Sequence, residues 1–316
     1  MIKKIFNKIR RALNNASNME NIIRDSLYNT SQEIVKETDR RNRVLLLQDR
    51  NFISTEIGIT NEKYFINNVI VSLTSHGKRI YDVYLTVESL MQQTIKPNKI
   101  ILWLAEDEFT LDNIPVTLKK LQNRGLTIEF CEDIKSYKKL VPALKKYPDD
   151  IIITADDDII YQYDLIENLL NSYKQNSELI HFCRGHRIKF KDDGTLEKYC
   201  NWSYYINDYL IDKLNFPTTG GGTLFPPHSL YSEVTNEKIF MTLAPHADDV
   251  WFKAMSLLQG VLSRKVFTHS SIGEDYVYLD GEVQKETALW DNINITKNDE
   301  QIQAVFLRYD IYKLLQ

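Results

Sequence analysis

The stretch IIITADDD, residues 151–158, decides the fold class of this chain. Its β-branched apolar run is typical of a strand buried on both faces, as in the parallel sheets of α/β proteins. Three aspartates, Asp156, Asp157 and Asp158, follow the run directly. Two unit charges about 5 Å apart repel by roughly 3 kcal/mol at an effective dielectric near 20. The sequence therefore predicts a positive partner at the end of this strand.

A divalent cation with oxygen ligands is the simplest such partner. In an extended segment alternate side chains share a face, so Asp156 and Asp158 are expected to point one way and Asp157 the other. That spacing suits two carboxylates that bind one ion. The alternative is an acidic turn that caps the next expected helix, residues 163–173.

Strand and helix patterns alternate on the N-terminal side of the aspartates, which predicts right-handed crossovers and a parallel sheet. Ligands of such sheets lie outside the carboxyl ends of the strands, where the aspartates are. We therefore expect an α/β fold with a mostly parallel sheet flanked by helices, a helical N-terminal extension and a C-terminal helix. The expected strands are 69–73, 99–104, 126–131 and 151–155, and the expected helices are 80–93, 114–124, 137–146 and 163–173.

The texture of the sequence suggests three segments among the 316 residues. Residues 1–66 are polar and helical in pattern, residues 67–285 carry the α/β alternation, and residues 286–316 form a helical tail. After residue 175 the pattern loosens, with expected strands at 179–183 and 186–190 joined to a turn at 191–195.

The composition excludes several classes of protein. A net charge of −4 and a pI near 5.9 argue against general nucleic-acid binding. The three cysteines, Cys131, Cys183 and Cys200, lack metal-ligand spacing, so we expect reduced, buried thiols in a cytosolic protein. No apolar stretch reaches the roughly 18 residues of a membrane span, and no signal peptide is evident. We expect a cytoplasmic protein.

The first 13 residues are basic, unlike the rest of the chain, and their apolar residues follow helical spacing. A basic amphipathic helix of this kind can lie on an anionic membrane surface, which would place the protein peripherally on the inner face of the cell membrane. The alternative is an ordinary surface helix that packs its apolar stripe on the domain.

Three further groups are candidates for chemistry. Gly220, Gly221 and Gly222 would let the backbone approach a ligand closely, or form a flexible turn. Asp248 and Asp249 begin an expected helix that runs to residue 259, where a carboxylate would cap the helix or act as a general base, or both.

His269 follows that helix at the end of an expected strand. A lone histidine is often structural, but a neutral imidazole also completes a carboxylate metal site.

These groups, in this order, resemble the GT-A glycosyltransferases, in particular family-2-like bacterial enzymes that build surface polysaccharides. Residues 69–75 and LTVESLMQQT, residues 85–94, are similar to the first strand and helix of that family. Residues 156–158 match its DXD motif, residues 220–222 its glycine loop, residues 247–249 its acceptor-side motif and His269 its C-terminal metal histidine. The resemblance covers about residues 67–275. The chain departs from the family at LAED, residues 104–107, where a double aspartate and glycine are usual, and at Asp248, where glutamate is usual.

The resemblance implies transfer of a sugar from a nucleotide diphosphate sugar, a UDP-sugar, to a hydroxyl of a saccharide or lipid-linked acceptor in capsule or other surface-polysaccharide synthesis. Mn²⁺ or Mg²⁺ would be held by Asp156, Asp158 and His269 and would neutralise the leaving diphosphate. Asp249, or else Asp248, would deprotonate the acceptor with inversion at the anomeric carbon.

The same resemblance implies a nucleotide pocket. Arg79 and Lys138 are expected to pair with phosphate, Asp133 to contact the base, and the aromatic segment around Trp202 to stack on sugars or to pack in the core. The residues assigned to the pocket are Thr74, Ser75, Arg79, Asp133, Lys138, Asp156, Asp157, Gly221 and Gly222.

The main alternative is a catalytically inert scaffold that binds nucleotide sugar or carbohydrate in a polysaccharide assembly complex. A haloacid-type phosphohydrolase is disfavoured because Asp156 and Ile160 fit its nucleophile motif poorly. A nucleotidyltransferase would need an N-terminal glycine-rich loop with arginine, which this sequence lacks.

Overall fold

The structure of the protein is a computed structural model that describes residues 2–268, 276–279 and 295–316; the side chains of residues 2–18, 20–22, 295 and 296 lie outside the description. The chain divides into two compact units, Met1–Asp49 and Arg50–Gln316. This boundary falls within the range 1–66 that the sequence assigns to the N-terminal extension.

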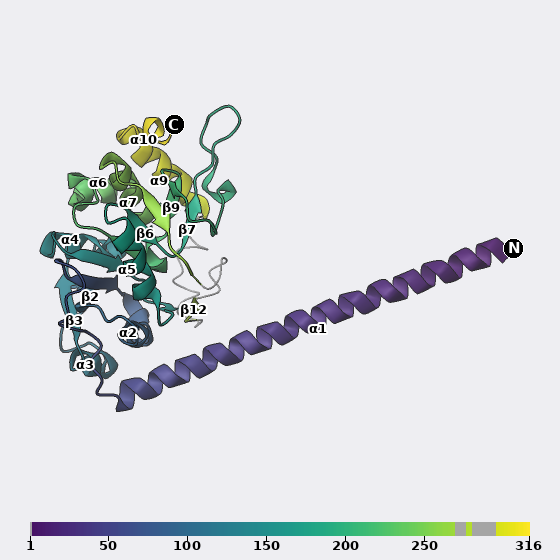
Figure 1. The fold of residues 1–316 in the computed structure, drawn as a ribbon, viewed down its shortest axis with the longest axis horizontal. Helices are drawn as coiled ribbons and strands as arrows, with labels where there is room; N and C mark the ends of the chain where they lie inside the picture. Colours follow the sequence, from purple (N-terminus) through teal and green to yellow (C-terminus); the bar gives the residue numbers. More distant parts are fainter. Residues whose placement is uncertain (1, 269–275, 280–294) are drawn as a thin grey trace. The chain divides into compact units, whose positions relative to one another are not determined.

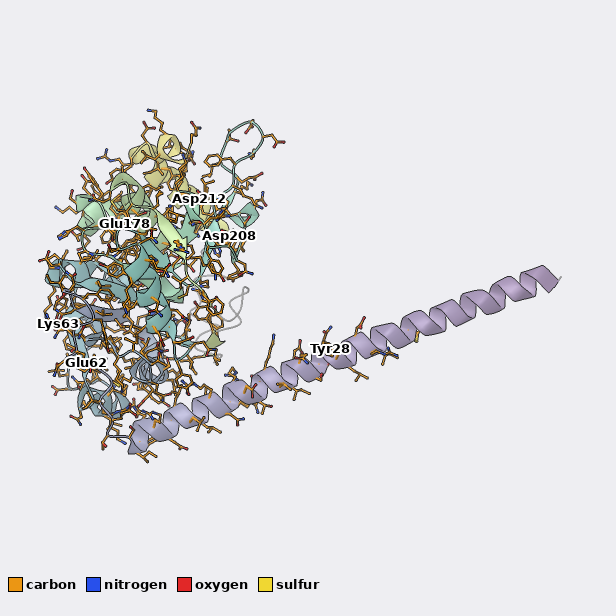
Figure 2. All side chains as sticks on the ribbon, viewed as in Figure 1. Tyr28, Glu62, Lys63, Glu178, Asp208 and Asp212 are labelled. Atoms are coloured by element: carbon orange, nitrogen blue, oxygen red, sulfur yellow. The ribbon has the colours of Figure 1, made fainter. Side chains whose placement is uncertain are left out.

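The first unit is formed by most of helix α1, Ile2–Ile53 (Figure 1). Its described apolar side chains are largely exposed, as in Ile23, Leu27 and Ile34, and Tyr28 projects from it in Figure 2. Near its end Glu37 accepts hydrogen bonds from Arg40 and Arg41, which hold the pKa of Glu37 down at about 2. In the part of the chain that the structure describes, no helix has the length and apolarity that a membrane span requires.

The second unit is built on an eight-stranded sheet with the order β3-β2-β1-β4-β10-β6-β11-β8. Strands β3, β2, β1 and β4 run parallel, β10 is antiparallel to both of its neighbours, β11 is parallel to β6, and β8 is antiparallel to β11. The predicted fold class, a mostly parallel α/β sheet with helices, is confirmed. The strands are β1 Val69–Thr74, β2 Lys99–Ala105, β3 Leu126–Cys131, β4 Ile151–Thr154, β6 Ile180–Phe182, β8 Ile211–Asp212, β10 Thr223–Phe225 and β11 Ser263–Lys265.

The parallel core forms because its strands are apolar on both faces. All of Ile151–Thr154 is buried, as are the first five residues of β1, and Val69 pairs with Ile151 in register. Burial of a β-branched side chain contributes about 1.5–3 kcal/mol, so this register removes most of the apolar surface of both strands from water. It also brings the ends of β1 and β4 to the same edge of the sheet.

Helices cover the sheet, and two short ladders lie beside it: β5 Ile159–Ile160 with β12 Val277–Tyr278, and β7 Gly185–Arg187 with β9 Asn215–Pro217 (Figure 1). The helices are α2 Val83–Met91, α3 Val116–Gln122, α4 Val141–Lys146, α5 Leu165–Gln175, α6 Glu237–Leu243, α7 Asp248–Leu258, α9 Ile295–Arg308 and α10 Ile311–Leu315. Short 3₁₀ turns are η1 Gly77–Tyr81, η2 Lys135–Lys139, η3 Tyr199–Asn201, η4 Thr219–Gly221 and η5 Ser232–Thr235.

Two predicted helices are interrupted. The expected helix 137–146 is split into η2 and α4, because Pro142 lacks the amide hydrogen of a helix interior and is confined to the first turn of α4. The expected C-terminal helix is split at Asp310, whose φ of +54° is left-handed and cannot continue a right-handed helix.

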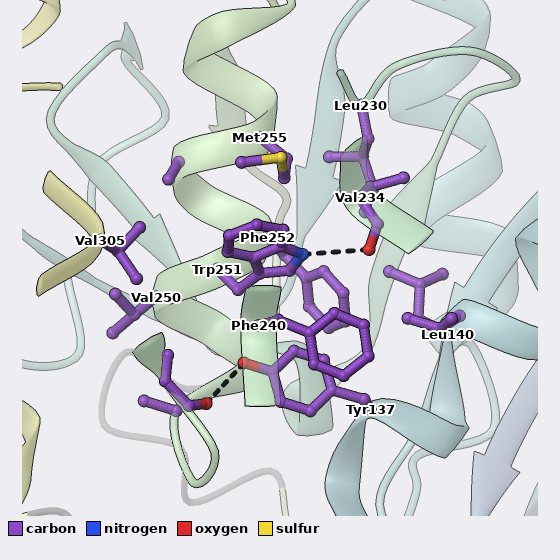
Figure 3. Close-up of a cluster of buried hydrophobic side chains, with 14 of the residues drawn as sticks. Tyr137, Leu140, Leu230, Val234, Phe240, Val250, Trp251, Phe252, Met255 and Val305 are labelled. Carbon is purple, nitrogen blue, oxygen red and sulfur yellow. Dashed lines mark hydrogen bonds between the residues drawn. The ribbon is translucent and has the colours of Figure 1, made fainter. Parts of the chain in front are cut away.

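An aromatic cluster joins α7 to η2 and to the C-terminal helices (Figure 3). The rings of Tyr137 and Phe240 stack with centroids 4.0 Å apart, and the Tyr137 hydroxyl donates to the Ala244 carbonyl at 2.6 Å. The Trp251 indole donates to the Val234 carbonyl at 3.0 Å, so both polar groups are satisfied within the core. The cluster therefore fixes η2 against α7, which matters for the site below.

The aromatic segment 199–209 is divided between core and surface: Tyr199 and Trp202 are buried, whereas Tyr205 and Tyr209 are exposed. Trp202 is 3% exposed and its ring lies 5.1 Å from that of Phe216, so core packing is the reading that the structure supports for Trp202. None of the three cysteines forms a disulfide, and Cys183 is buried as expected. The expectation of buried thiols is wrong for Cys200, which is exposed in η3, and for the half-buried Cys131.

Candidate functional site

The candidate site lies where the strand order of the sheet reverses. From β1 the chain moves outward through β2 to β3 and then returns to place β4 on the other side of β1. Ligands of open α/β sheets bind outside the carboxyl ends of the strands at such a switch point. Ser75 follows β1 there, and Asp156, Asp157 and Asp158 follow β4.

Asp157 ties the ends of β1 and β4 together. It is 6% exposed, and its two carboxylate oxygens accept hydrogen bonds from Ser75 Oγ at 2.7 Å and Arg79 Nη1 at 2.6 Å. Its carbonyl accepts from Thr86 Oγ1 at 3.0 Å. Because both carboxylate oxygens are engaged within the protein, Asp157 holds this edge of the sheet together.

Asp158 shares Arg79 with Asp157, through a contact of 3.2 Å. The strict alternation expected of an extended segment does not hold, because the chain bends at Asp157 and Asp158 before β5 begins. Burial and the nearby charges of Asp157 and Asp156 raise the pKa of Asp158 to about 6, although Arg79 opposes the shift. The negative charge of Asp158 is therefore only partly balanced by the positive charge of Arg79.

Asp156 lies against the glycine loop. Its Oδ1 accepts a hydrogen bond from Lys139 Nζ at 2.6 Å, and its backbone amide donates to the Tyr161 hydroxyl at 2.8 Å. That hydroxyl donates in turn to the Gly220 carbonyl at 2.5 Å. A Cβ atom on Gly220 would lie 1.6 Å from Asp156 Oδ2, so any side chain at this position would displace the carboxylate.

Gly221 and Gly222 are also tightly enclosed. A Cβ atom on Gly221 would lie 2.4 Å from Arg184 Cβ, and Gly222 has a φ of +90° with Leu165 packed where a Cβ would be. Gly220 therefore brings the backbone against Asp156, whereas Gly221 and Gly222 pack against Arg184 and Leu165.

Helix α7 brings the second acidic pair to the same place. Asp249 Oδ1 accepts hydrogen bonds from the backbone amide and the hydroxyl of Thr219, at 2.9 and 2.5 Å. Burial and the adjacent Asp248 raise the pKa of Asp249 to about 6, against the opposing charge of Lys139. The side chain of Asp248 is buried, and its Oδ2 lies 3.3 Å from Lys139 Nζ.

Lys139 is the residue that links the two acidic groups, and the sequence did not single it out. Burial alone would lower its pKa, but the carboxylates of Asp156, Asp248 and Asp249 outweigh burial and raise it, so the side chain stays charged. The motif SYKKL, residues 136–140, offered a signal, because its two adjacent lysines follow a strand end. The sequence analysis assigns the neighbouring Lys138 to the nucleotide pocket instead.

Lys138 points to a different partner. It forms an ion pair with Asp133, which is half-exposed beyond the end of β3 and also accepts a hydrogen bond from the Lys135 amide at 3.1 Å.

Thr74 donates from its hydroxyl to the Trp103 carbonyl at 2.8 Å. The structure thus brings Ser75, Arg79 and the two acidic groups together, whereas Lys138 and Asp133 form a separate pair. His269 lies outside the described residues.

Arg184 is a second cation that the sequence did not single out. It donates from Nε to Thr218 Oγ1 at 2.8 Å and from Nη1 to the Tyr278 hydroxyl at 2.7 Å. Its guanidinium lies 5.5 Å from the centre of the Tyr276 ring. Its carbon chain is packed against Gly221, which places a positive charge beside the glycine loop. This charge stabilises the ionised carboxylate of Asp156 and lowers its pKa.

The charges of the site support a divalent cation. Among the described residues, five aspartates at positions 156–158, 248 and 249 face three cations, Arg79, Lys139 and Arg184, so the negative charges outnumber the positive ones by two. In the described part of the chain, Asp156 Oδ2 and Asp158 Oδ1 accept no hydrogen bond. The described residues contain no group of three or more His, Cys, Asp or Glu side chains arranged to hold a metal. Mg²⁺ is commonly bound by one or two carboxylates plus substrate phosphates, so Asp156 Oδ2 and Asp158 Oδ1 are the oxygens that would be available to such an ion.

Comparisons with known proteins find similarity to solved structures but no sequence relatives. No protein-family model matches the sequence, and no curated protein matches it. One similar solved structure is a mannosyltransferase from Pyrobaculum calidifontis in complex with GDP-Man and Mn²⁺, at 11% identity and a TM-score of 0.39, covering 73% of this chain and 64% of that one. Another is a CMP:2-keto-3-deoxy-manno-octonic acid synthetase complexed with CTP, at 12% identity and a TM-score of 0.37, covering 63% of this chain and 89% of that one. The chain thus spans less than two thirds of the mannosyltransferase, and the function is argued below from the site itself.

Proposed function

We propose that this protein transfers a sugar from a nucleotide diphosphate sugar, a UDP-sugar, to a hydroxyl of a saccharide or lipid-linked acceptor in cell-surface polysaccharide synthesis. One observation carries the proposal: Lys139 contacts both Asp156 at the end of β4 and Asp248 at the start of α7. Two acidic groups with different surroundings therefore face one site at the switch point of the sheet. One suits a metal and a diphosphate, and the other suits proton removal.

The donor half of the site is assigned to the end of β4. Asp156 and Asp158 would hold Mn²⁺ or Mg²⁺, and the ion when bound supplies positive charge against the leaving diphosphate. Arg184, beside Gly221, offers a further donor for phosphate oxygens, and the glycine loop lets backbone and phosphate approach closely. Asp157 acts on the site by holding Ser75 and Arg79 in place.

The acceptor half is assigned to the start of α7, with Asp249 as the general base. Its Oδ1 is held by the amide and hydroxyl of Thr219, which orients the carboxylate and leaves Oδ2 to accept the proton of the attacking hydroxyl. A pKa raised to about 6 makes Asp249 a stronger base than an ordinary aspartate while it stays ionised at neutral pH. Asp248 faces Lys139 instead, which favours Asp249 for this role. Attack from the side opposite the diphosphate gives inversion.

The cellular setting is part of the proposal. Basic residues within 1–13 of α1 would bring the enzyme to the anionic inner face of the cell membrane, where lipid-linked acceptors are presented. Loss of binding to anionic vesicles in a protein that lacks residues 1–13 would support this; undiminished binding would contradict it.

The function is tested by a thermal-shift screen of nucleotide sugars with and without Mn²⁺, followed by a release assay for the nucleoside diphosphate with saccharide acceptors. The proposal predicts that a UDP-sugar raises the unfolding temperature only with Mn²⁺ and that an acceptor accelerates UDP release. Binding without any release would favour the inert scaffold. No shift with any nucleotide sugar would contradict both readings.

A further inference from the structure

Lys139 occupies a position that a metal ion on Asp156 would contest. Its Nζ lies 2.6 Å from Asp156 Oδ1 and 3.3 Å from Asp248 Oδ2. We infer that Lys139 is a positioning residue that competes with the metal for Asp156. When a metal binds Asp156, the Lys139 ammonium group moves toward Asp248. This inference rests on the proposed function, and it adds a coupling between the two halves of the site.

The backbone that carries Lys139 is rigid. In η2, Tyr137 is fully buried, stacked on Phe240 and hydrogen-bonded to the Ala244 carbonyl, and Leu140 is also fully buried. Lys139, which is 6% exposed, carries its ammonium group on a flexible four-carbon chain beyond this anchor. A small rotation is therefore enough to move the ammonium group between its two carboxylate partners while η2 stays in place.

Asp248 has an oxygen atom that can accept a hydrogen bond from that ammonium group. Within the described residues its Oδ2 is buried and accepts no hydrogen bond, although Lys139 Nζ is only 3.3 Å away. A buried carboxylate oxygen without a hydrogen bond is costly, so Asp248 gains when Lys139 turns toward it. Its contact with Asp156 therefore keeps Lys139 from forming a hydrogen bond with Asp248.

A divalent cation on Asp156 changes this balance. The ammonium group of Lys139 would be repelled by the bound ion and would move toward Asp248, where it would donate a hydrogen bond to the unsatisfied Oδ2. Asp249 follows Asp248 in the first turn of α7 and interacts electrostatically with Lys139, so loading of the donor half would change the charge environment of the base.

The test is the affinity for Mn²⁺ alone, measured by calorimetry on the full chain. Lys139→Met removes the competing cation, so Mn²⁺ is expected to bind about fivefold or more tightly, at the low end of typical coupling between sites. The rate of sugar transfer is expected to fall at least about tenfold, and Lys139→Arg, which keeps the charge, should recover most of it. A purely structural role for Lys139 predicts weaker or unchanged Mn²⁺ binding, and that result would overturn the inference.

Lys146→Met is the matched control, because Lys146 also forms a 2.6 Å ion pair, with Glu129, but on the surface. It should leave the Mn²⁺ affinity unchanged. If it tightens Mn²⁺ binding as much as Lys139→Met does, the effect reflects net charge alone and the inference fails.

Asp248→Asn tests the coupling without altering Lys139. It leaves Lys139 with Asp156 as its main partner, so Mn²⁺ affinity should fall severalfold, and the fall should be smaller in the Lys139→Met background. Equal falls in both backgrounds would overturn the coupling. If the wild-type protein transfers sugar with Mn²⁺ but shows none of these changes, only this inference fails; if it binds no Mn²⁺ with or without UDP, the proposed function fails with it.

Discussion

Gly220 leaves no space between its own backbone and the carboxylate of Asp156, since a Cβ atom there would lie 1.6 Å from Asp156 Oδ2. The glycine loop and the aspartate cluster, 64 residues apart in the sequence, thus form one surface. The Tyr161 hydroxyl joins them again, through the Asp156 amide and the Gly220 carbonyl.

Gly220→Ala is expected to displace the Asp156 side chain from Lys139 and from the metal position. Mn²⁺-dependent binding of a nucleotide should weaken by about tenfold or more, roughly 1.4 kcal/mol or above. Calorimetry with UDP and Mn²⁺ measures this.

The matched control is Gly194→Ala, in the exposed turn after β7. A Cβ there meets nothing within 4 Å, but φ is +80°, so the substitution should cost about 1 kcal/mol of stability through backbone strain. It should leave nucleotide binding intact. Equal loss of binding in both variants would mean that the Gly220 effect is only a loss of stability.

Asp249→Asn is expected to abolish sugar transfer and to spare donor binding, because the amide keeps the shape of the side chain but cannot take a proton. In the wild-type protein the transfer rate should fall as the pH drops through about 6, where the Asp249 carboxylate becomes protonated. A pH–rate profile of the two proteins checks both statements. An active Asp249→Asn variant would exclude Asp249 as the base.

The same substitution is expected to stabilise the fold at alkaline pH. The pKa of Asp249 is raised from 3.8 to about 6, so the folded state binds this proton more tightly than the unfolded state. The stabilisation by protonation is complete below about pH 4 and is lost as the pH rises through 6. At pH 8 Asp249→Asn should therefore be more stable than the wild type by on the order of 1–3 kcal/mol, with a smaller difference at pH 5. Urea denaturation at the two pH values measures it; lower stability of the variant at pH 8 would contradict the electrostatic account.

Glu88 and Arg124 form a buried ion pair between α2 and the residues that follow α3. Both side chains are almost fully buried, two hydrogen bonds join them, and Arg124 Nε also donates to the Glu56 carbonyl at 2.8 Å. Glu88→Ala leaves the guanidinium buried without its carboxylate, which should cost about 3–5 kcal/mol. Denaturation by urea would show it.

The comparison for this prediction is Glu129→Ala, which breaks the exposed pair with Lys146 and should cost no more than about 1 kcal/mol. Similar losses in the two variants would refute the role assigned to burial.

The parallel half of the sheet could be predicted because local sequence determines it. β1 and β4 are short apolar runs buried on both faces, and their ends carry the polar residues that define the site. The predicted strand 126–131 coincides with β3, and the glycines and the acidic pair of α7 were also identified from sequence. In each case the signal lies within a few consecutive residues.

Lys139 and Arg184 could not be predicted in the same way, because their roles depend on contacts distant in the sequence. Lys139 meets Asp248 109 residues later in the chain, through a core formed by Tyr137, Phe240 and Trp251. Periodicity gave no reason to prefer Lys139 over Lys138, since the 3₁₀ turn η2, rather than the expected helix, sets the directions of both side chains. The core position of Trp202 likewise depends on Phe216, which no local pattern connects to it.

The central claim, a donor site that binds a metal together with a diphosphate at Asp156 and Asp158, is tested most directly by the affinity for UDP with and without Mn²⁺. Asp158→Ala is compared with Asp149→Ala, which alters an exposed aspartate paired only with His228 among the described residues. We predict that Mn²⁺ tightens UDP binding at least about tenfold in the wild type and in Asp149→Ala and has no effect in Asp158→Ala. Equal UDP affinity with and without Mn²⁺ in the wild type would contradict the account.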